Sequence, residues 1–122
     1  MPAPPAPPET LAIVNARVWT GDARRPWADA LLVQGHQITA VGSSAEVKKR
    51  AGPALVVDAK GMMVVPMSTE SRVGTIAPGQ MADLIVLERH ITRVAPDAIR
   101  DAGIVLTVSA GRIVYDRDGL TH

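Results

Sequence analysis

The stretch GMMVVPMSTESRVGTIAPGQMAD, residues 61–83, decides the fold of this chain. It begins with an apolar strand, Met62 to Val65, which ends at Pro66 because proline has no N–H to give to a sheet ladder. A short polar connection, residues 67–72, leads towards a second apolar strand, Ala82 to Leu87. We therefore expect two half-sheets, one from each side of the connection, to pair into a single sandwich.

Upstream of this stretch, the sequence alternates in the way that β-strands do. Leu11 to Thr20 is predicted to be one strand. Its two faces would carry Leu11, Ile13 and Trp19 on one side, and Val14, Ala16 and Val18 on the other. Ala30 to Val33 and Gln37 to Val41 then flank Gly35, which can supply the positive φ of a tight turn, so a hairpin is predicted.

Two further strand regions lie on either side of the central connection. Leu55 to Asp58 and Met62 to Val65 are predicted to form either a strand pair or one strand bent at Lys60-Gly61. Near the C-terminal end, Ile104 to Val108 and Arg112 to Tyr115 flank a turn, which predicts a last hairpin.

Two short helices are also predicted. Ser43 to Ala51 starts with Ser43 and Glu46 at the spacing of a capping box. Pro96 to Ala102 has proline in its first turn and Gly103 just beyond its end. The predicted fold class is therefore mainly β, a β-sandwich with two short helices.

The length and composition favour one domain. A chain of 122 residues with 47% apolar content can bury a core without disulfides or a metal. We expect a disordered proline-rich tail at residues 1–10 and a single domain at residues 11–122. Its N-terminal half covers residues 11–66 and its C-terminal half residues 73–119.

Several partners are not expected. A chain without cysteine offers no thiolate for zinc. A net charge of +1 and only three aromatic residues give nucleic acid little to bind. No apolar run reaches the length of about 20 residues that spans a bilayer. The sequence thus favours a cytoplasmic protein with no nucleic-acid or membrane partner.

Few side chains are candidates for chemistry. Lys60 invites comparison with the modified lysine of biotin or lipoyl carriers, but the residue after it is glycine instead of methionine or aspartate. Asp83, at the start of a strand, is interpreted as a structural residue that binds local backbone amides. His36, His90 and His122 are dispersed and lack the spacing of zinc ligands, so they are interpreted as solvated residues. No catalytic, cofactor-binding or metal-binding residue is predicted, and no cofactor.

The segment Gly74 to Leu87, with the V-V-P before it and the hairpin Val108 to Tyr115 after it, resembles the flanks of the catalytic barrel in the amidohydrolase superfamily. The resemblance is closest to the imidazolonepropionase-like and YtcJ-like branches, and the V-x-G-x-x-I-x-x-V-G pattern from Val33 to Gly42 agrees with it. In such enzymes the first strand leads into an Asp-x-His-x-His metal motif and a TIM barrel. Here Met67 to Glu70 follows Pro66 at once, so the barrel's metal ligands have no matching positions.

The resemblance implies a non-catalytic structural module, the small β-sandwich composite domain of an amidohydrolase-like protein without its barrel. The parent would hydrolyse amide or related C–N bonds, whereas the chain as it stands is expected to be no enzyme. Its partners would be the missing barrel and a second copy of itself, because removing a barrel uncovers apolar surface. The alternative is a free-standing small β-sandwich that binds a ligand or acts as a carrier.

Overall fold

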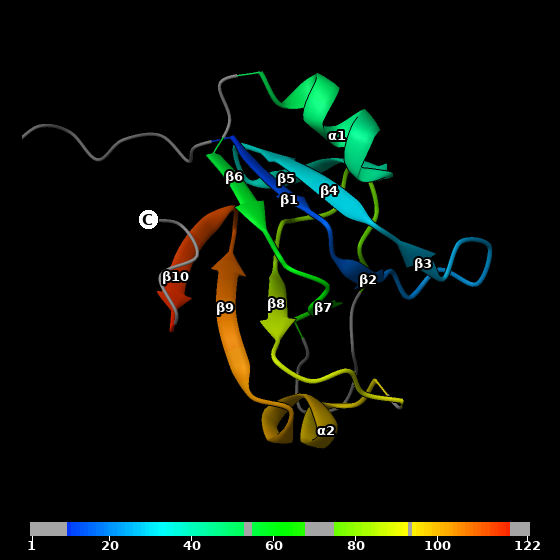
Figure 1. The fold of residues 1–122 in the computed structure, drawn as a ribbon, viewed down its shortest axis with the longest axis vertical. Coiled ribbons are helices and arrows are strands. Elements are labelled where there is room, and N and C mark those ends of the chain that lie inside the picture. Colours follow the sequence, from blue (N-terminus) through cyan, green and yellow to red (C-terminus); the bar gives the residue numbers. More distant parts are fainter. Residues whose placement is uncertain (1–9, 53–54, 68–74, 93, 118–122) are drawn as a thin grey trace, which may run out of the picture.

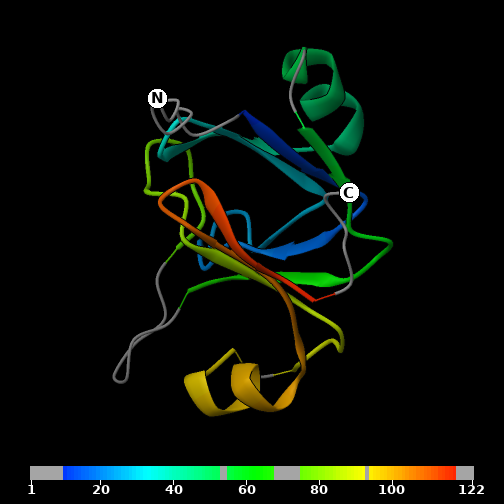
Figure 2. The ribbon, with the colours of Figure 1, turned by 90° about the vertical axis from the view of Figure 1, so that its left-hand side faces the viewer.

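The structure is a computed structural model that describes residues 10–52, 55–67, 75–92 and 94–117, and it contains two β-sheets packed face to face (Figures 1 and 2). Sheet A has the strand order β5-β4-β1-β6, with β1 Leu11–Val14, β4 Ala30–Gln34, β5 Gln37–Gly42 and β6 Leu55–Asp58. Sheet B has the order β10-β9-β8-β7-β2-β3, with β2 Arg17–Trp19, β3 Trp27–Ala28, β7 Met63–Pro66, β8 Leu84–Leu87, β9 Ile104–Ser109 and β10 Arg112–Asp116. Two short helices, α1 Ser44–Ala51 and α2 Pro96–Asp101, complete the mainly-β fold that the sequence predicted.

Apolar side chains fill three layers of this fold. The largest layer lies between the two sheets. Helix α1 covers the outer face of sheet A through Val47 and Ala51, and helix α2 covers the outer face of sheet B through Ile99. Figure 2 shows the two helices on opposite sides of the sandwich. Neither helix has the length and the apolar character that crossing a membrane would require in the described part of the chain.

The predicted strand from Leu11 to Thr20 is in fact two strands, and this prediction was wrong. Asn15 has φ 54°, a left-handed conformation that asparagine tolerates better than most residues. The kink carries the chain from sheet A to sheet B and shifts the alternation by one residue. Ile13 and Val18 therefore share the layer between the sheets, whereas Trp19 packs on the opposite side of sheet B with the α2 layer.

The next two strands also lie in different sheets. β6 runs parallel to β1 in sheet A, and β7 runs parallel to β2 in sheet B. Lys60 (φ 52°) and Gly61 (φ 82°) form the turn between them, and the Gly61 N–H donates to the Asn15 carbonyl at 2.7 Å. The strand-pair alternative was wrong, because β6 pairs with β1 in sheet A, whereas β7 lies between β2 and β8 in sheet B. The alternative of one strand bent at Lys60-Gly61 gave the right position for the bend, but it was wrong about the strand, because the chain forms two strands in different sheets.

The hairpins and helices were predicted correctly. β4 and β5 are joined at Gly35 (φ 64°), and β9 and β10 are joined at Ala110 and Gly111, which both have positive φ. The side chain of Ser43 accepts a hydrogen bond from the Glu46 N–H at 3.2 Å, which caps α1 as the sequence indicated.

The two half-sheets meet at β7 and β8. These strands are antiparallel neighbours, with a register that runs from Met63 opposite Leu87 to Pro66 opposite Leu84. The Met67 N–H donates to the Asp83 carbonyl at 3.0 Å and extends this pairing by one step. Sheet B therefore combines strands from both sides of the central connection. Most of the predicted connection and of the predicted proline-rich tail (residues 68–72 and 1–9) lies outside the described residues.

This seam leads to a prediction about the connection. Replacing Ser68-Thr69 by a Gly-Ser linker that doubles the length of the connection should lower the free energy of unfolding by only about 0.6 kcal/mol, because loop-closure entropy grows with the logarithm of length. Urea unfolding of both chains measures the difference. A loss of several kcal/mol would mean that the connection packs as part of the core.

Candidate functional site

Lys60 lies at the exposed tip of the turn between β6 and β7. Its N–H donates to Asp58 Oδ1 at 2.9 Å, and Asn15 Nδ2 donates to the same oxygen at 3.3 Å. Asp58 thus ties together the two places where the chain crosses between the sheets. Because this turn joins strands of different sheets, Lys60 is not presented on a hairpin, which is the arrangement that carriers use.

The same contacts lower the pKa of Asp58 from its ordinary value of 3.8, first through the hydrogen bond from the Lys60 amide and then through that from Asn15. A carboxyl whose pKa is lower in the folded state stabilises the fold above its unfolded-state pKa, and this contribution is lost as the pH falls through the folded-state pKa.

We therefore expect the unaltered chain to be more stable than Asp58→Asn at neutral pH and to lose this advantage below about pH 4. Urea unfolding of both proteins at several pH values measures the difference. An advantage that stays constant down to about pH 2 would contradict this assignment.

Asp83 has a structural partner, although not the local amides that the sequence suggested. Its Oδ1 accepts a hydrogen bond at 2.7 Å from the N–H of Ala110, which lies 27 residues later in the β9–β10 turn. Asp83 itself is partly buried and lies directly before β8. The carboxylate therefore fixes the position of the β9–β10 hairpin relative to β8.

His36 lies where the tips of the two hairpins touch. Its Nδ1 is 2.9 Å from the carbonyl oxygen of Ala110, so Nδ1 carries the proton that it donates. The Ala82 N–H donates to the His36 carbonyl at 2.8 Å, and the Gly111 N–H donates to the Ala82 carbonyl at 3.1 Å. His36 is exposed, but it belongs to a hydrogen-bonded contact that joins both hairpins to the segment before β8.

His90 has a similar role at another place. Its Nε2 is 2.7 Å from the carbonyl oxygen of Gly61, so it links the segment after β8 to the turn before β7. His122 lies outside the described residues. Each of the two described histidines thus binds a backbone carbonyl in a separate turn.

The enzymes that this chain resembles hold a divalent metal in their barrel, and the described residues of this chain do not fit one. Within them, no group of three or more His, Cys, Asp or Glu side chains lies close enough to hold a metal ion.

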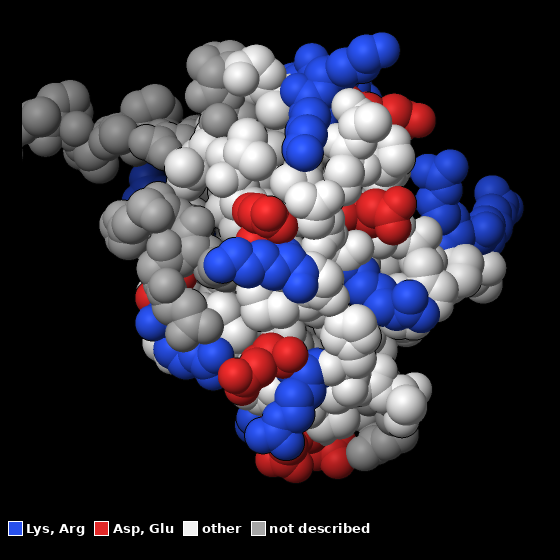
Figure 3. Space-filling model, viewed as in Figure 1, with Lys and Arg blue, Asp and Glu red and all other residues white. Residues whose placement is uncertain are grey.

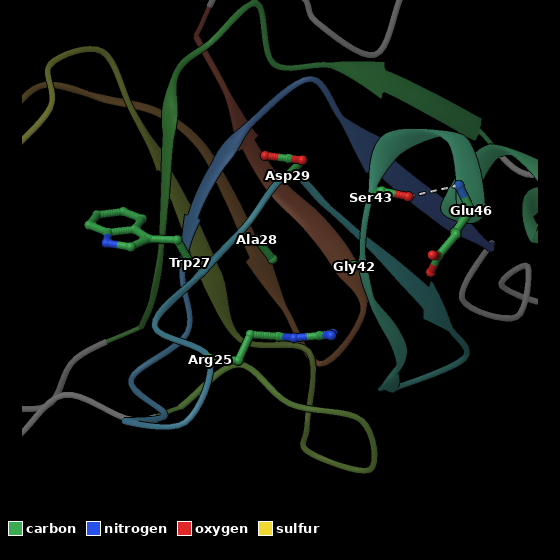
Figure 4. A pocket seen from close by; sticks show the side chains of 7 residues that line it. All are labelled: Arg25, Trp27, Ala28, Asp29, Gly42, Ser43 and Glu46. Carbon is green, nitrogen blue, oxygen red and sulfur yellow. Dashed lines mark hydrogen bonds between the residues drawn. The ribbon is translucent and has the colours of Figure 1, made fainter.

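The described part of the chain contains a pocket of about 270 Å³ between the β3 region and the start of α1 (Figure 4). It is lined by Arg25, Trp27, Ala28, Asp29, Gly42, Ser43 and Glu46. In Figure 4 the Trp27 ring points away from the Arg25 side chain, and this ring is stacked against the guanidinium of Arg17, 4.2 Å from its centroid. The pocket is therefore polar, with one guanidinium and two carboxylates on its wall.

Opposite charges on one wall suit a small molecule that carries both an anionic and a cationic group. All three charged side chains are exposed, so each contact would be weak. The sequence did not reveal this pocket, because its lining depends on tertiary contacts of residues 25–29 with residues 41–46. These contacts include the hydrogen bonds from the Asp29 N–H to the Gly42 carbonyl and from Arg25 Nη1 to the Val41 carbonyl.

The charged side chains on the face of Figure 3 are interspersed. Lys and Arg gather over α1 and over the loop between β2 and β3, with Asp and Glu side chains between them. The described residues of this face therefore form no broad basic surface of the kind that binds a phosphate backbone.

Comparisons with known proteins agree with the resemblance in the sequence. Residues 67–115 match the sequence profile of the amidohydrolase family. The chain is 36% identical over 102 residues to an N-substituted formamide deformylase from Arthrobacter pascens. This match covers 70% of this chain and 19% of that protein. It is also 30% identical over 98 residues to the protein LONG AFTER FAR-RED 3 from Arabidopsis thaliana. This second match covers 75% of this chain and 17% of that protein.

Solved structures show a partial likeness. An uncharacterized metal-dependent hydrolase from Pyrococcus furiosus matches with a TM-score of 0.48 and 20% identity, over 52% of this chain and 14% of that chain. An enamidase described as a new member of the amidohydrolase superfamily matches with a TM-score of 0.41 and 35% identity, over 47% of this chain and 15% of the enamidase chain.

The sequence matches carry the assignment. The matched profile begins at Met67, directly after β7, and ends at Tyr115 in β10, so it includes the seam strand β8 and the last hairpin. The chain spans 19% and 17% of the two curated relatives. On these sequence matches, the chain belongs to the amidohydrolase superfamily.

Proposed function

We propose that this chain is a structural module without a catalytic site of its own, the β-sandwich part of an amidohydrolase-like protein. The observation that carries the proposal is the pairing of β7 with β8. The strand that ends at Pro66 and the strand that begins at Leu84 are neighbours in one sheet, although 17 residues separate them in the sequence (84 − 66 − 1 = 17). In the enzymes that this chain resembles, the two corresponding strands flank a catalytic barrel. The sandwich would therefore hold the two ends of such a barrel together.

The name of one relative supports a substrate class for the complete protein. An N-substituted formamide contains a C–N amide bond, and one relative is named for removing the formyl group from such compounds. The complete protein would thus hydrolyse amide or related C–N bonds, with the catalytic residues outside the segments that form this sandwich.

Metal content and hydrolysis test the proposal together. The purified chain is incubated with excess Zn²⁺, desalted and analysed for metal, and it is then assayed against an N-substituted formamide beside the Arthrobacter enzyme as a positive control. We expect far less than one Zn²⁺ per chain and hydrolysis at the background rate. Close to one tightly held Zn²⁺ per chain, with hydrolysis that chelation abolishes, would overturn the proposal.

A ligand-binding module is the second candidate, favoured by the pocket beside Arg25. Titration of the labelled chain with a zwitterionic amino acid, followed by NMR, distinguishes the two. Saturable shifts confined to residues 25–29 and 42–46, lost in Arg25→Gln, would favour the binding module. Shifts that do not saturate would leave the structural role as the better account.

A further inference from the structure

Within the described residues, the two sheets have four edge strands, β5, β6, β3 and β10, and these differ in how they are protected. Exposed edges invite pairing with another chain, and natural sheets usually cover, shorten or charge them. The β5 edge is covered, because the Ile38 N–H donates to the Gln80 carbonyl and the Gly79 N–H donates to the Ile38 carbonyl, both at 2.8 Å. Further along β5, Arg25 Nη1 lies 3.4 Å from the Val41 carbonyl.

Two of the other edges are short. β3 at one edge of sheet B has two residues, and its Trp27 ring is stacked with Arg17. β6 at the second edge of sheet A has four residues and runs parallel to its neighbour. These strands offer little backbone to a partner.

β10, at the remaining edge of sheet B, is the exception. It has five residues and lies at the outer edge of the sheet in Figure 1. Its register with β9 skips Val114, since Ile113 pairs with Val108 and Tyr115 pairs with Thr107. This bulge leaves two adjacent apolar side chains in solvent, with Val114 62% exposed and Tyr115 46% exposed. The strand contains neither proline nor lysine, so its protection is limited to the bulge and to one charged residue at each end.

We infer that a second copy of this chain covers the β10 edge, with the two β10 strands antiparallel about a two-fold axis near Val114. Arg112 begins the strand and Asp116 ends it. A two-fold axis at Val114 places Arg112 of each copy beside Asp116 of the other, so the charges at both ends are complementary. Asp116 also interacts within its own chain, and the contact with the second copy adds to that interaction.

The bulge and the helices decide the form of this contact. Because a bulge interrupts the backbone ladder, the contact depends on the side chains of Val114 and Tyr115 more than on a continuous row of hydrogen bonds. Helices α1 and α2 pack on the outer faces of sheets A and B, so a face-to-face dimer over either packed region would have to displace a helix. An edge contact leaves both helices in place, and a two-fold contact closes after two copies.

The first experiment compares exposed apolar residues on different edges. Light scattering coupled to size exclusion follows the full chain over a dilution series from about 1 mM to about 10 µM, the range suited to a small interface. We expect a concentration-dependent dimer, and we expect Val114→Lys to raise its dissociation constant about tenfold or more, since the contact occurs in a cross-strand pair at the axis. The matched controls are Val56→Lys on β6 and Met81→Lys before β8, which replace residues that are 45% and 55% exposed. Both should leave the dissociation constant unchanged.

The second experiment tests the antiparallel two-fold arrangement. Arg112→Asp alone places Asp beside Asp116 at both ends of its homodimer, and Asp116→Arg alone places Arg beside Arg112. Each variant should therefore associate more weakly than the unaltered chain. An equimolar mixture of the two should form a heterodimer, because each negative strand then faces a positive one. Circular dichroism of each variant, compared with the unaltered chain, shows that the fold is retained.

Each result bears on the inference. Loss of the dimer with Val114→Lys and recovery of association in the mixture support it. A chain that stays monomeric throughout the dilution series overturns it, and the β10 edge would then be left for a different partner. A dimer weakened by Val56→Lys or Met81→Lys but not by Val114→Lys also overturns it, as does a mixture that associates no better than its components.

Discussion

Replacing Gly111 with alanine is expected to lower the free energy of unfolding by about 3–5 kcal/mol, the sum of left-handed backbone strain and several weakened hydrogen bonds. A Cβ at this position would overlap the carbonyl oxygen of Gly35, and it would lie 3.0 Å from the Gly35 carbonyl carbon and 3.2 Å from the His36 Cα. All three atoms belong to the backbone, so no change of rotamer relieves the overlap. The two hairpin tips would have to separate.

Separation of the tips breaks a connected set of contacts. The bonds at risk are those from the Ala110 N–H to Asp83, from the Gly111 N–H to Ala82, and between His36 and Ala110. Each hydrogen bond contributes about 1 kcal/mol, and a buried group left without a partner costs more.

Gly61→Ala is the matched control. Gly61 has φ +82°, the same value as Gly111, but a Cβ added there would meet nothing within 4 Å. It should therefore cost only the backbone strain of about 1–2 kcal/mol. Urea unfolding of both variants isolates the effect of the close approach as their difference. Equal losses would mean that the hairpin tips move apart without cost.

Leu84→Ala should have the second large effect, a loss of about 2–5 kcal/mol from the free energy of unfolding. Leu84 is fully buried between the two sheets. Its register partners are Pro66 of β7 and Val108 of β9. Truncation would leave a cavity at the seam where the two half-sheets meet, and the strands on both sides limit how far it can collapse.

Met81→Ala serves as the control for this substitution. It removes a long apolar side chain three residues earlier in the same segment, but Met81 is 55% exposed. Its effect should stay within about 0.5 kcal/mol. Chemical denaturation of the two variants measures both values. A loss below about 1 kcal/mol for Leu84→Ala would contradict a packed seam.

The sequence by itself determined the local elements of this protein. The capping box at Ser43 and Glu46 predicted the start of α1, and glycine at Gly35 and Gly111 predicted the two hairpin turns. Such signals act within a few residues, so they can be recognised without the rest of the fold. The family resemblance likewise depended on a local motif, the segment that leads into β8.

The tertiary structure alone decided which sheet each strand joins. Alternation shows which side chains of a strand are buried, but it is the same for strands of either sheet, so the crossings at Asn15 and Lys60-Gly61 were missed. The partners of Asp83, His36 and His90 are 27, 74 and 29 residues away, and no pattern of short period records them. Tertiary packing also decided three further features, because each depends on how distant segments pack after the local elements have formed. These are the approach of Gly35 to Gly111, the pocket beside Arg25 and the exposed β10 edge.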